Sequence, residues 1–178
     1  MTLLLTNVLE WDTRLFHIIF RWNGARLRDR VMLAITRSGD GYIWGVLGLA
    51  LLLNGSSEAM SCVAAGVIAF AIHLPIYKIV KTRVSRPRPF EILTGVKNLI
   101  TVPDRFSFPS GHTASAFLMT TLCANFLPES SYVMIPWSFL IAISRVYLGV
   151  HFPLDVTAGA VLGIIHARLG IWIFQLLR

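Results

Sequence analysis

Apolar residues occur in long runs, separated by short polar turns, over most of the chain. A helix that crosses a membrane needs roughly 20 mainly apolar residues. Runs that approach or reach this length occupy residues 41–57, 59–80, 110–127, 132–148 and 153–177, and the first of them is short. The pattern therefore predicts an all-α fold, a polytopic membrane helical bundle of about five to six spans.

Residues 1–40 carry a different pattern. Apolar residues recur there at intervals of three and four positions, among charged residues, over residues 3–22 and again over residues 27–36. This spacing predicts two amphipathic helices that lie at the membrane interface. Two ordinary helices packed against the bundle fit the pattern equally well, and neither segment suggests chemistry. No small-residue cleavage site follows the first apolar residues, so we expect the N-terminus to be retained.

The composition supports a membrane protein. The 178 residues are 55% hydrophobic and only 14% charged, which is too apolar for a soluble domain of average composition. The net charge of +7 suits an anionic lipid or a phosphorylated substrate better than nucleic acid in such a chain. Cys62, Cys123 and His73 fall inside predicted spans, without metal-ligand spacing, and are expected to be packing residues. Gly159 and Gly163 have the GxxxG spacing of closely packed helices.

Three polar stretches interrupt the apolar pattern, at residues 81–89, 109–112 and 144–155. The first opens a loop rich in Lys, Arg and Pro that we expect outside the hydrocarbon, over residues 81–109. Two predicted spans separate this loop from the link at residues 149–153, so both emerge on the same side of the membrane. Charged groups at membrane depth are costly, and their convergence on one face predicts a functional site.

The residue types in these stretches suit the transfer of a phosphoryl group. Such a reaction needs positive charge around the phosphate oxygens, a nucleophile and a proton donor for the leaving oxygen. Lys81, Arg88 and Arg145 supply the charge, and the guanidinium fork of Arg matches two phosphate oxygens at once. Ser110 sits where a helix begins, so its hydroxyl and the next amides are expected to point at the anion. Gly111 lets the backbone approach closely.

The spacing of these residues is specific. Lys81 is followed after six residues by Arg-Pro, His112 ends a Pro-Ser-Gly-His, and Ser-Arg is followed after five residues by His151 and after three more by Asp155. Together the patterns resemble the three-part signature of the type 2 phosphatidic acid phosphatase superfamily, which also contains the vanadium-dependent haloperoxidases. Every signature position is filled. The resemblance covers about residues 59–163, and residues 1–40 lie outside the signature.

The resemblance implies a role for each polar residue. His151 is implied to be the nucleophile that forms a phosphohistidine, with Asp155 holding its other ring nitrogen and fixing the tautomer. His112 is implied to be the general acid for the leaving group. Asp155 also lies in the first turn of a predicted helix, where a carboxylate is electrostatically favoured, and the two roles are compatible. A structural ion pair between Arg145 and Asp155 is the alternative that involves no chemistry.

No metal or cofactor is expected. Three fixed cations already face the phosphate, and the loop carboxylates Glu91 and Asp104 are isolated in the sequence, so no cluster suits Mg²⁺. We therefore predict metal-independent catalysis. The other loop cations have no place in the signature and are expected to be solvated or to face lipid headgroups: Arg83, Arg86, Lys97 and Arg105.

These features predict an integral membrane phosphatase that acts on a lipid phosphate or diphosphate; membrane lipids are its expected surroundings, no nucleic acid is expected, and the pattern does not predict an oligomeric state. The resemblance suggests undecaprenyl diphosphate, phosphatidylglycerophosphate, phosphatidic acid or a lipid A phosphate. A lipid phosphotransferase that uses a diphosphate lipid donor is the alternative, and a vanadate-dependent haloperoxidase or a non-catalytic scaffold is more remote. We expect a single domain over residues 1–178, with an interfacial segment at 1–40 and a catalytic bundle at 41–178.

Two indications of the orientation in the membrane disagree. Lys and Arg are most abundant on the side that carries the site, which the positive-inside rule assigns to the cytoplasm. The resemblance implies the bacterial inner membrane with the site on its periplasmic or outer face. We favour the outward site because several of the counted Lys and Arg residues are expected to bind phosphate, and these residues bias the positive-inside count.

Overall fold

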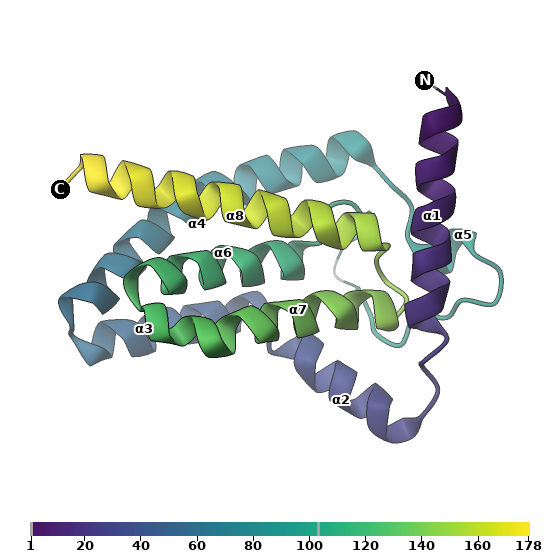
Figure 1. The fold of residues 1–178 in the computed structure, drawn as a ribbon, viewed down its shortest axis with the longest axis horizontal. Coiled ribbons are helices and arrows are strands. Elements are labelled where there is room, and N and C mark those ends of the chain that lie inside the picture. Colours follow the sequence, from purple (N-terminus) through teal and green to yellow (C-terminus); the bar gives the residue numbers. More distant parts are fainter. Residues whose placement is uncertain (1, 103) are drawn as a thin grey trace.

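The computed structural model describes residues 2–102 and 104–178, and this part of the chain is helical with no strand (Figure 1). The all-α prediction is therefore confirmed. The helices, in chain order, are α1 Thr2–Phe20, α2 Arg26–Arg37, α3 Gly41–Asn54, α4 Ser57–Val84, α5 Pro89–Ile92, α6 Gly111–Phe126, the 3₁₀ helix η1 Pro128–Ser130, α7 Ser131–Tyr147 and α8 Pro153–Leu176.

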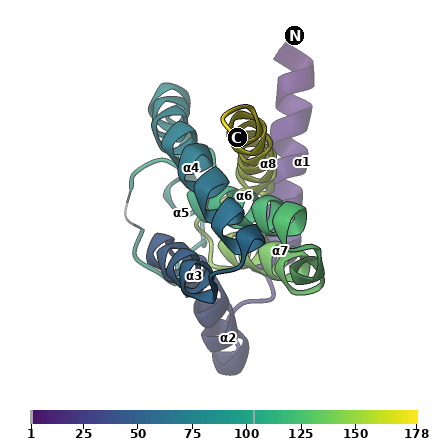
Figure 2. The ribbon, with the colours of Figure 1, turned by 90° about the vertical axis from the view of Figure 1, so that its left-hand side faces the viewer.

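Five helices, α3, α4, α6, α7 and α8, run side by side along the long axis of the molecule (Figures 1 and 2). Helix α6 lies in the centre and packs against α4, α7 and α8. The α6–α8 contact is close, as the GxxxG spacing predicted. A Cβ atom on Gly159 would lie 2.5 Å from the carbonyl oxygen of Ser110, and one on Gly163 would collide with the carbonyl of Ala114. This contact fixes the start of α6 against α8.

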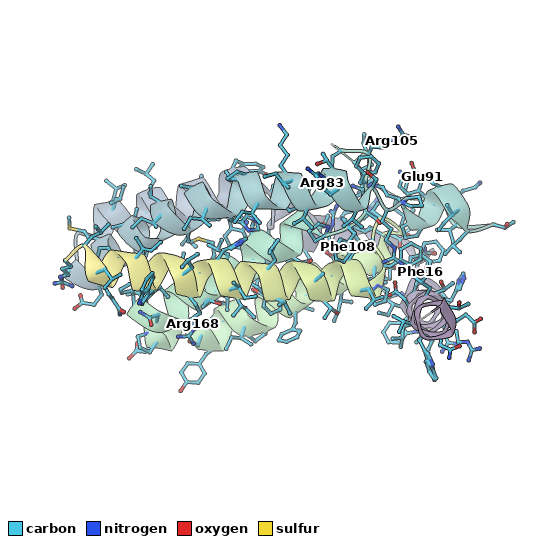
Figure 3. All side chains as sticks on the ribbon, turned by 90° about the horizontal axis from the view of Figure 1, so that it is seen from above. Phe16, Arg83, Glu91, Arg105, Phe108 and Arg168 are labelled. Atoms are coloured by element: carbon cyan, nitrogen blue, oxygen red, sulfur yellow. The ribbon has the colours of Figure 1, made fainter. Side chains whose placement is uncertain are left out.

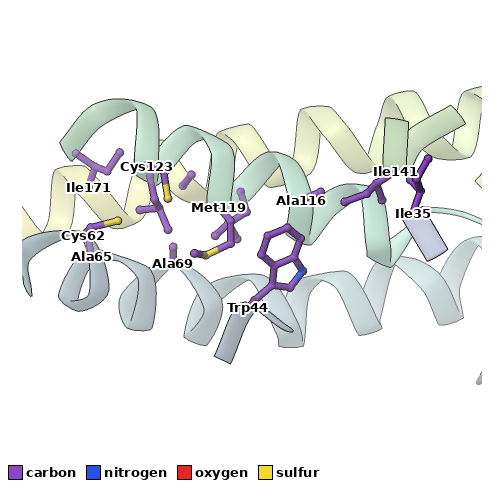
Figure 4. Close-up of a cluster of buried hydrophobic side chains, with 13 residues drawn as sticks. Ile35, Trp44, Cys62, Ala65, Ala69, Ala116, Met119, Cys123, Ile141 and Ile171 are labelled. Atoms are coloured by element: carbon purple, nitrogen blue, oxygen red, sulfur yellow. The ribbon is translucent and has the colours of Figure 1, made fainter. Parts of the chain in front are cut away.

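The core between these helices is apolar and built partly from small residues (Figure 4). Cys62 and Cys123 are buried in it as free thiols, as predicted. His73 on α4 is also buried, and its Nδ1 lies 2.9 Å from Nδ1 of His166 on α8. His73 is therefore a hydrogen-bonded residue of the helix interface.

Two segments are long and apolar enough to cross a bilayer by themselves: Ser57–Ile92, which contains α4, and Pro153–Leu176, which is α8. Helix α3 is a shorter apolar helix, and α6 and α7 have 16 and 17 residues. The number of spans therefore stays a prediction. Helix α4 also runs beyond the predicted end at residue 80, so Lys81 lies on a helix instead of in the following loop.

The N-terminal helices lie at one end of the bundle (Figure 1). Helix α1 crosses this end and does not run along the bundle, and it is seen end-on in Figure 3. Its inner face buries Phe16 against Phe152, with ring centroids 5.5 Å apart, while Trp11 and Leu15 on its outer face are exposed. Helix α2 packs against α7 and buries Ile35 and Thr36. Both helices thus pack against the bundle, and the interfacial position of their outer faces stays a prediction.

Candidate functional site

The three polar stretches meet at the end of the bundle that α1 crosses. The Ser110 N–H donates to the carbonyl of Asp155 at 2.9 Å, which joins the start of α6 to the start of α8. Lys81 Nζ lies 3.4 Å from the carbonyl oxygen of Pro109, and an Arg88 guanidinium nitrogen donates to the carbonyl of Val150 at 2.8 Å. Stretches far apart in the sequence are therefore neighbours, as the topology argument predicted.

The three predicted phosphate-binding cations are all buried, with 6%, 1% and 2% of Lys81, Arg88 and Arg145 exposed. A buried cation is costly unless counter-charges and hydrogen bonds surround it. Arg145 donates to the Thr36 hydroxyl of α2 at 2.7 Å, and within the described residues it forms no ion pair. The Nε atoms of Arg88 and Arg145 are buried without a partner. The two arginines are therefore only partly satisfied, which suits a site built for an anion.

Asp104 has two cationic partners that its position in the sequence did not indicate. Its two carboxylate oxygens lie 3.0 Å from Lys81 Nζ and 2.6 Å from an Arg88 guanidinium nitrogen. The loop folds back because the two buried cations need a counter-charge. Burial raises the pKa of Asp104, but the charges of Lys81 and Arg88 outweigh this effect and hold that pKa below its usual value. Glu91 also has a partner, since its carboxylate accepts the Arg88 backbone N–H at 2.7 Å.

His151 lies in the short link between α7 and α8. The chain turns at Gly149 with a φ of 77°, a conformation that favours glycine, and the imidazole that follows is 2% exposed. Its Nδ1 is 3.6 Å from Asp155 Oδ2, which is too long for a hydrogen bond, and has no other partner. Burial first, and then the positive charges around the site, hold the pKa of His151 well below its ordinary value, so the ring is neutral.

The side chain of Asp155 is tied to two groups other than Arg145. Its Oδ2 accepts the Phe152 N–H at 2.8 Å, which is the helix-start role that the sequence predicted. Its Oδ1 lies 2.7 Å from a guanidinium nitrogen of Arg86. The structural alternative, an ion pair between Arg145 and Asp155, is therefore wrong. Asp155 is held in place beside His151 and leaves Nε2 of that ring free.

Arg86 is not part of a solvated set, contrary to the prediction for the loop cations. Only 16% of its side chain is exposed, and it forms ion pairs with both Asp155 and Asp12. Arg86 is held inside because Asp12, a carboxylate of α1 that lies outside the signature, pairs with it in addition to Asp155. Arg83 and Arg105 are exposed as predicted (Figure 3), and so is Lys97.

His112 has a partner that the sequence did not indicate. Its Nε2 lies 2.8 Å from Oδ1 of Asp40, the residue that precedes α3. Asp40 stands alone before an apolar run, so no spacing pattern singled it out. Ser110 is buried, and its hydroxyl pairs with Thr113 at 2.9 Å. At Gly111 a Cβ atom would lie 2.8 Å from the Tyr77 hydroxyl, so the close approach there requires glycine.

A cavity of about 630 Å³ adjoins His112 and Arg145. Its polar wall combines these two side chains with Thr36, Arg37 and Asp40, and the remainder is formed by Leu33, Leu99, Ile100, Thr101 and Val102. An anionic group with an apolar attachment matches this division of the lining. Among the described residues no group of three or more His, Cys, Asp or Glu side chains is arranged to hold a metal ion.

The fold is similar to those of two solved structures. LpxE of Aquifex aeolicus superimposes with a TM-score of 0.75 and 30% identity, over 90% of this chain and 94% of that one. The first transmembrane PAP2 type phosphatidylglycerolphosphate phosphatase from Bacillus subtilis gives a TM-score of 0.75 at 22% identity, over 97% and 88% of the two chains, and this match shows the fold alone. By length and composition, the two long apolar segments fit an integral membrane protein.

Three curated proteins are similar to this chain in sequence. The chain is 35% identical over 127 residues to the bacitracin transport permease protein BcrC of Bacillus licheniformis, and this match covers 71% of the chain and 63% of BcrC. It is 29% identical over 159 residues to the undecaprenyl-diphosphatase of Sulfolobus acidocaldarius, covering 87% and 74%. The decaprenylphosphoryl-5-phosphoribose phosphatase of Mycolicibacterium smegmatis is 35% identical over 118 residues, covering 65% and 62%. The chain thus matches somewhat less than two thirds of the length of BcrC and of the mycobacterial phosphatase.

The family model of the PAP2 superfamily matches residues 58–178. This range contains all three polar stretches and the helices that carry them, α4 to α8. Helices α1 and α2, which supply Asp12 and Thr36, precede this range, and so does Asp40 at the N-terminus of α3. The match covers well over half of the sequence, and the chain belongs to the PAP2 superfamily.

Proposed function

We propose that the chain hydrolyses a lipid phosphate or diphosphate in the membrane, through a phosphohistidine on His151. The observation that carries this proposal is the position of a neutral, buried imidazole among three buried cations at one end of an apolar bundle. The cations Lys81, Arg88 and Arg145 bind the phosphate oxygens and stabilise the charge that develops on them.

In the first step, Nε2 of His151 attacks phosphorus and the bond from phosphorus to the leaving oxygen breaks. Asp155 accepts the hydrogen bond of the Nδ1–H, so that positive charge on the ring is stabilised. A modest movement of the ring closes the 3.6 Å gap between the two groups. His112, oriented by Asp40, gives a proton to the leaving oxygen.

In the second step, a water molecule attacks the phosphohistidine and His112 takes its proton. The products are inorganic phosphate and the lipid with one phosphate fewer, which is a monophosphate from a diphosphate or an alcohol from a monophosphate, and His151 returns to its neutral form. The three cations supply the positive charge that phosphoryl transfer requires, so we propose that the reaction is independent of metal ions and of any cofactor.

Among lipid substrates we place polyprenyl phosphates and diphosphates first, with undecaprenyl diphosphate as the lead. Relatives named for undecaprenyl and decaprenyl lipids support this order. Phosphatidylglycerophosphate, phosphatidic acid and a lipid A phosphate complete the set to be compared. The partly apolar cavity beside His112 suits a phosphate carried on a lipid.

The test is phosphate release from each of these lipids by the purified protein in detergent, with EDTA present and absent. We expect release from a polyprenyl diphosphate that EDTA does not reduce, and loss of turnover in His151→Ala. A ³²P-labelled substrate should leave acid-labile label on the wild-type protein but none on that variant. Turnover by His151→Ala contradicts the nucleophile assignment, and transfer of label to an added lipid acceptor in place of water identifies a phosphotransferase.

We also propose that residues 1–178 form one domain in the bacterial inner membrane, with the site on its outer face. The packing of α1 and α2 on α7 and α8 supports a single unit. Because Cys62 and Cys123 are buried, a cysteine introduced by Thr94→Cys on the exposed loop reports on orientation without interference. An impermeant maleimide added to intact cells should label it. Labelling only after the cells are opened places the site on the cytoplasmic side.

A further inference from the structure

Helix α1 contains a buried acid that packing does not explain. Asp12 is 2% exposed, although the neighbouring Trp11 and Leu15 are exposed, and Phe16, one turn further on, is buried. Burying a carboxylate costs several kcal/mol unless charges and hydrogen bonds compensate for it. A helix that only covers the end of the bundle does not need this group.

Both oxygens of Asp12 are used. Oδ2 lies 2.6 Å from a guanidinium nitrogen of Arg86, and Oδ1 accepts the backbone N–H of Leu154 at 2.8 Å. Leu154 lies in the first turn of α8, immediately before Asp155. Asp12 therefore contacts both the start of α8 and Arg86, which lies two residues before Arg88 of the signature.

Arg86 continues the chain of contacts to the nucleophile. Its other terminal nitrogen lies 2.7 Å from Oδ1 of Asp155, and its guanidinium carbon lies 4.1 Å from the centre of the Phe152 ring. The guanidinium is planar and rigid, so contacts at both ends and on one face fix its position. Asp155 in turn presents Oδ2 to His151.

Resting on the function proposed above, we propose that Asp12 and Arg86 are positioning residues for His151, which act through Asp155. Arg86 is shared between two carboxylates, so Asp12 limits how much of the negative charge of Asp155 it neutralises. Asp155 keeps the charge that stabilises the Nδ1–H of His151 during attack. Helix α1, outside the family match, is then part of the catalytic apparatus.

The proposal predicts which kinetic constant changes. Neither Asp12 nor Arg86 is placed at the phosphate, so their loss should leave substrate binding unchanged and slow the chemical step. We expect Asp12→Asn to lower kcat about tenfold, in line with other residues that orient a reacting group, with KM within about twofold of the wild type. Arg86→Gln should lower kcat at least as much. The double variant should be no slower than Arg86→Gln, because the two residues act in series.

Glu10→Gln is the matched control. It removes the same charge from the same helix, but Glu10 is exposed and pairs only with exposed Arg14 at 3.6 Å. Its kcat should equal that of the wild type. Asp12→Asn keeps an oxygen for the Leu154 N–H, so folding should be preserved, and its melting temperature is measured to check this. Arg86→Lys, which keeps the positive charge, is measured in the same way as a second variant. Equal kcat in Asp12→Asn and Glu10→Gln, or a rise in KM at unchanged kcat, overturns the proposal.

A second measurement does not depend on turnover. In protein labelled with ¹⁵N-histidine, the Nδ1 resonance of His151, assigned with His151→Gln, should shift in Asp12→Asn and stay in place in Glu10→Gln. An unchanged resonance in Asp12→Asn overturns the proposal even if phosphate is released. A wild type that releases phosphate from no lipid overturns the proposed function, and the resonance still decides whether α1 acts on His151.

Discussion

Asp104 forms ion pairs with two of the three cations to which we assign phosphate binding. Its carboxylate contacts Lys81 at 3.0 Å and Arg88 at 2.6 Å, so a bound phosphate has to displace it from both. The substitution Asp104→Asn removes the negative charge and keeps the size of the side chain. We therefore expect this variant to bind a phosphate analogue more tightly than the wild type.

The size of the effect follows from the two contacts. About 40% of the Asp104 side chain is exposed, so solvent screens both pairs and each is taken as about 1 kcal/mol, the upper end for exposed pairs. Removing about 2 kcal/mol of competition corresponds to roughly a 30-fold gain in affinity. The lowered pKa of Asp104 keeps the carboxylate charged at neutral pH, so the competition operates under ordinary assay conditions.

The assay is inhibition by orthovanadate, which resembles the phosphoryl group in transfer, measured against a lipid substrate in detergent. The inhibition constant of Asp104→Asn should fall roughly 30-fold, and added salt should reduce the difference between variant and wild type. Glu129→Gln, an exposed acid on η1, is the control and should change nothing. A weaker inhibition by vanadate in Asp104→Asn refutes the reasoning, because Asp104 then organises the two cations and does not compete with phosphate.

Three further outcomes are expected. Asp40→Asn should lower kcat about tenfold, because His112 loses the carboxylate 2.8 Å from its Nε2, and an unchanged kcat contradicts that pairing. Gly163→Ala should lower the melting temperature, since overpacking costs about 1–3 kcal/mol, whereas Gly48→Ala, with nothing within 4 Å of its Cβ, should not. The pKa of His151 is lower in the folded state than in the unfolded chain, so the unfolded chain binds more protons as the pH falls below about 6.5. Stability should therefore fall as the pH is lowered through this range, and His151→Gln should reduce that dependence in thermal melts.

The sequence predicted the helical fold and the convergence of the polar stretches because both depend on patterns that a single chain displays. Apolar run length indicates helices in a membrane, and an even number of intervening spans places the loop after Lys81 and the link before Pro153 on one side. The helix ends were less well predicted. Helix α4 continues to Val84, beyond the end of its apolar run, because Lys81 turns back toward the Tyr77 hydroxyl at 2.7 Å and toward Asp104.

The partners of the charged residues were not predictable in the same way. Asp12, Asp40 and Asp104 are single acids in unrelated segments, and no spacing relates them to Arg86, His112 or Lys81. Their roles arise only in three dimensions, where Arg86, His112 and Lys81 each lie next to one of these carboxylates. A sequence signature records residues at fixed separations along the chain, so it does not include partners that come from a different helix.

The origin of these acids bears on how the site is divided between the family domain and the preceding helices. Residues 58–178 contain the proposed nucleophile and the proposed phosphate-binding cations, but the carboxylates next to Arg86 and His112 come from α1 and from the residue before α3. Arg145 likewise relies on Thr36 of α2. A buried charge whose partner is removed is destabilised by about 3–5 kcal/mol. The segment before residue 58 therefore supplies partners for Arg86, His112 and Arg145.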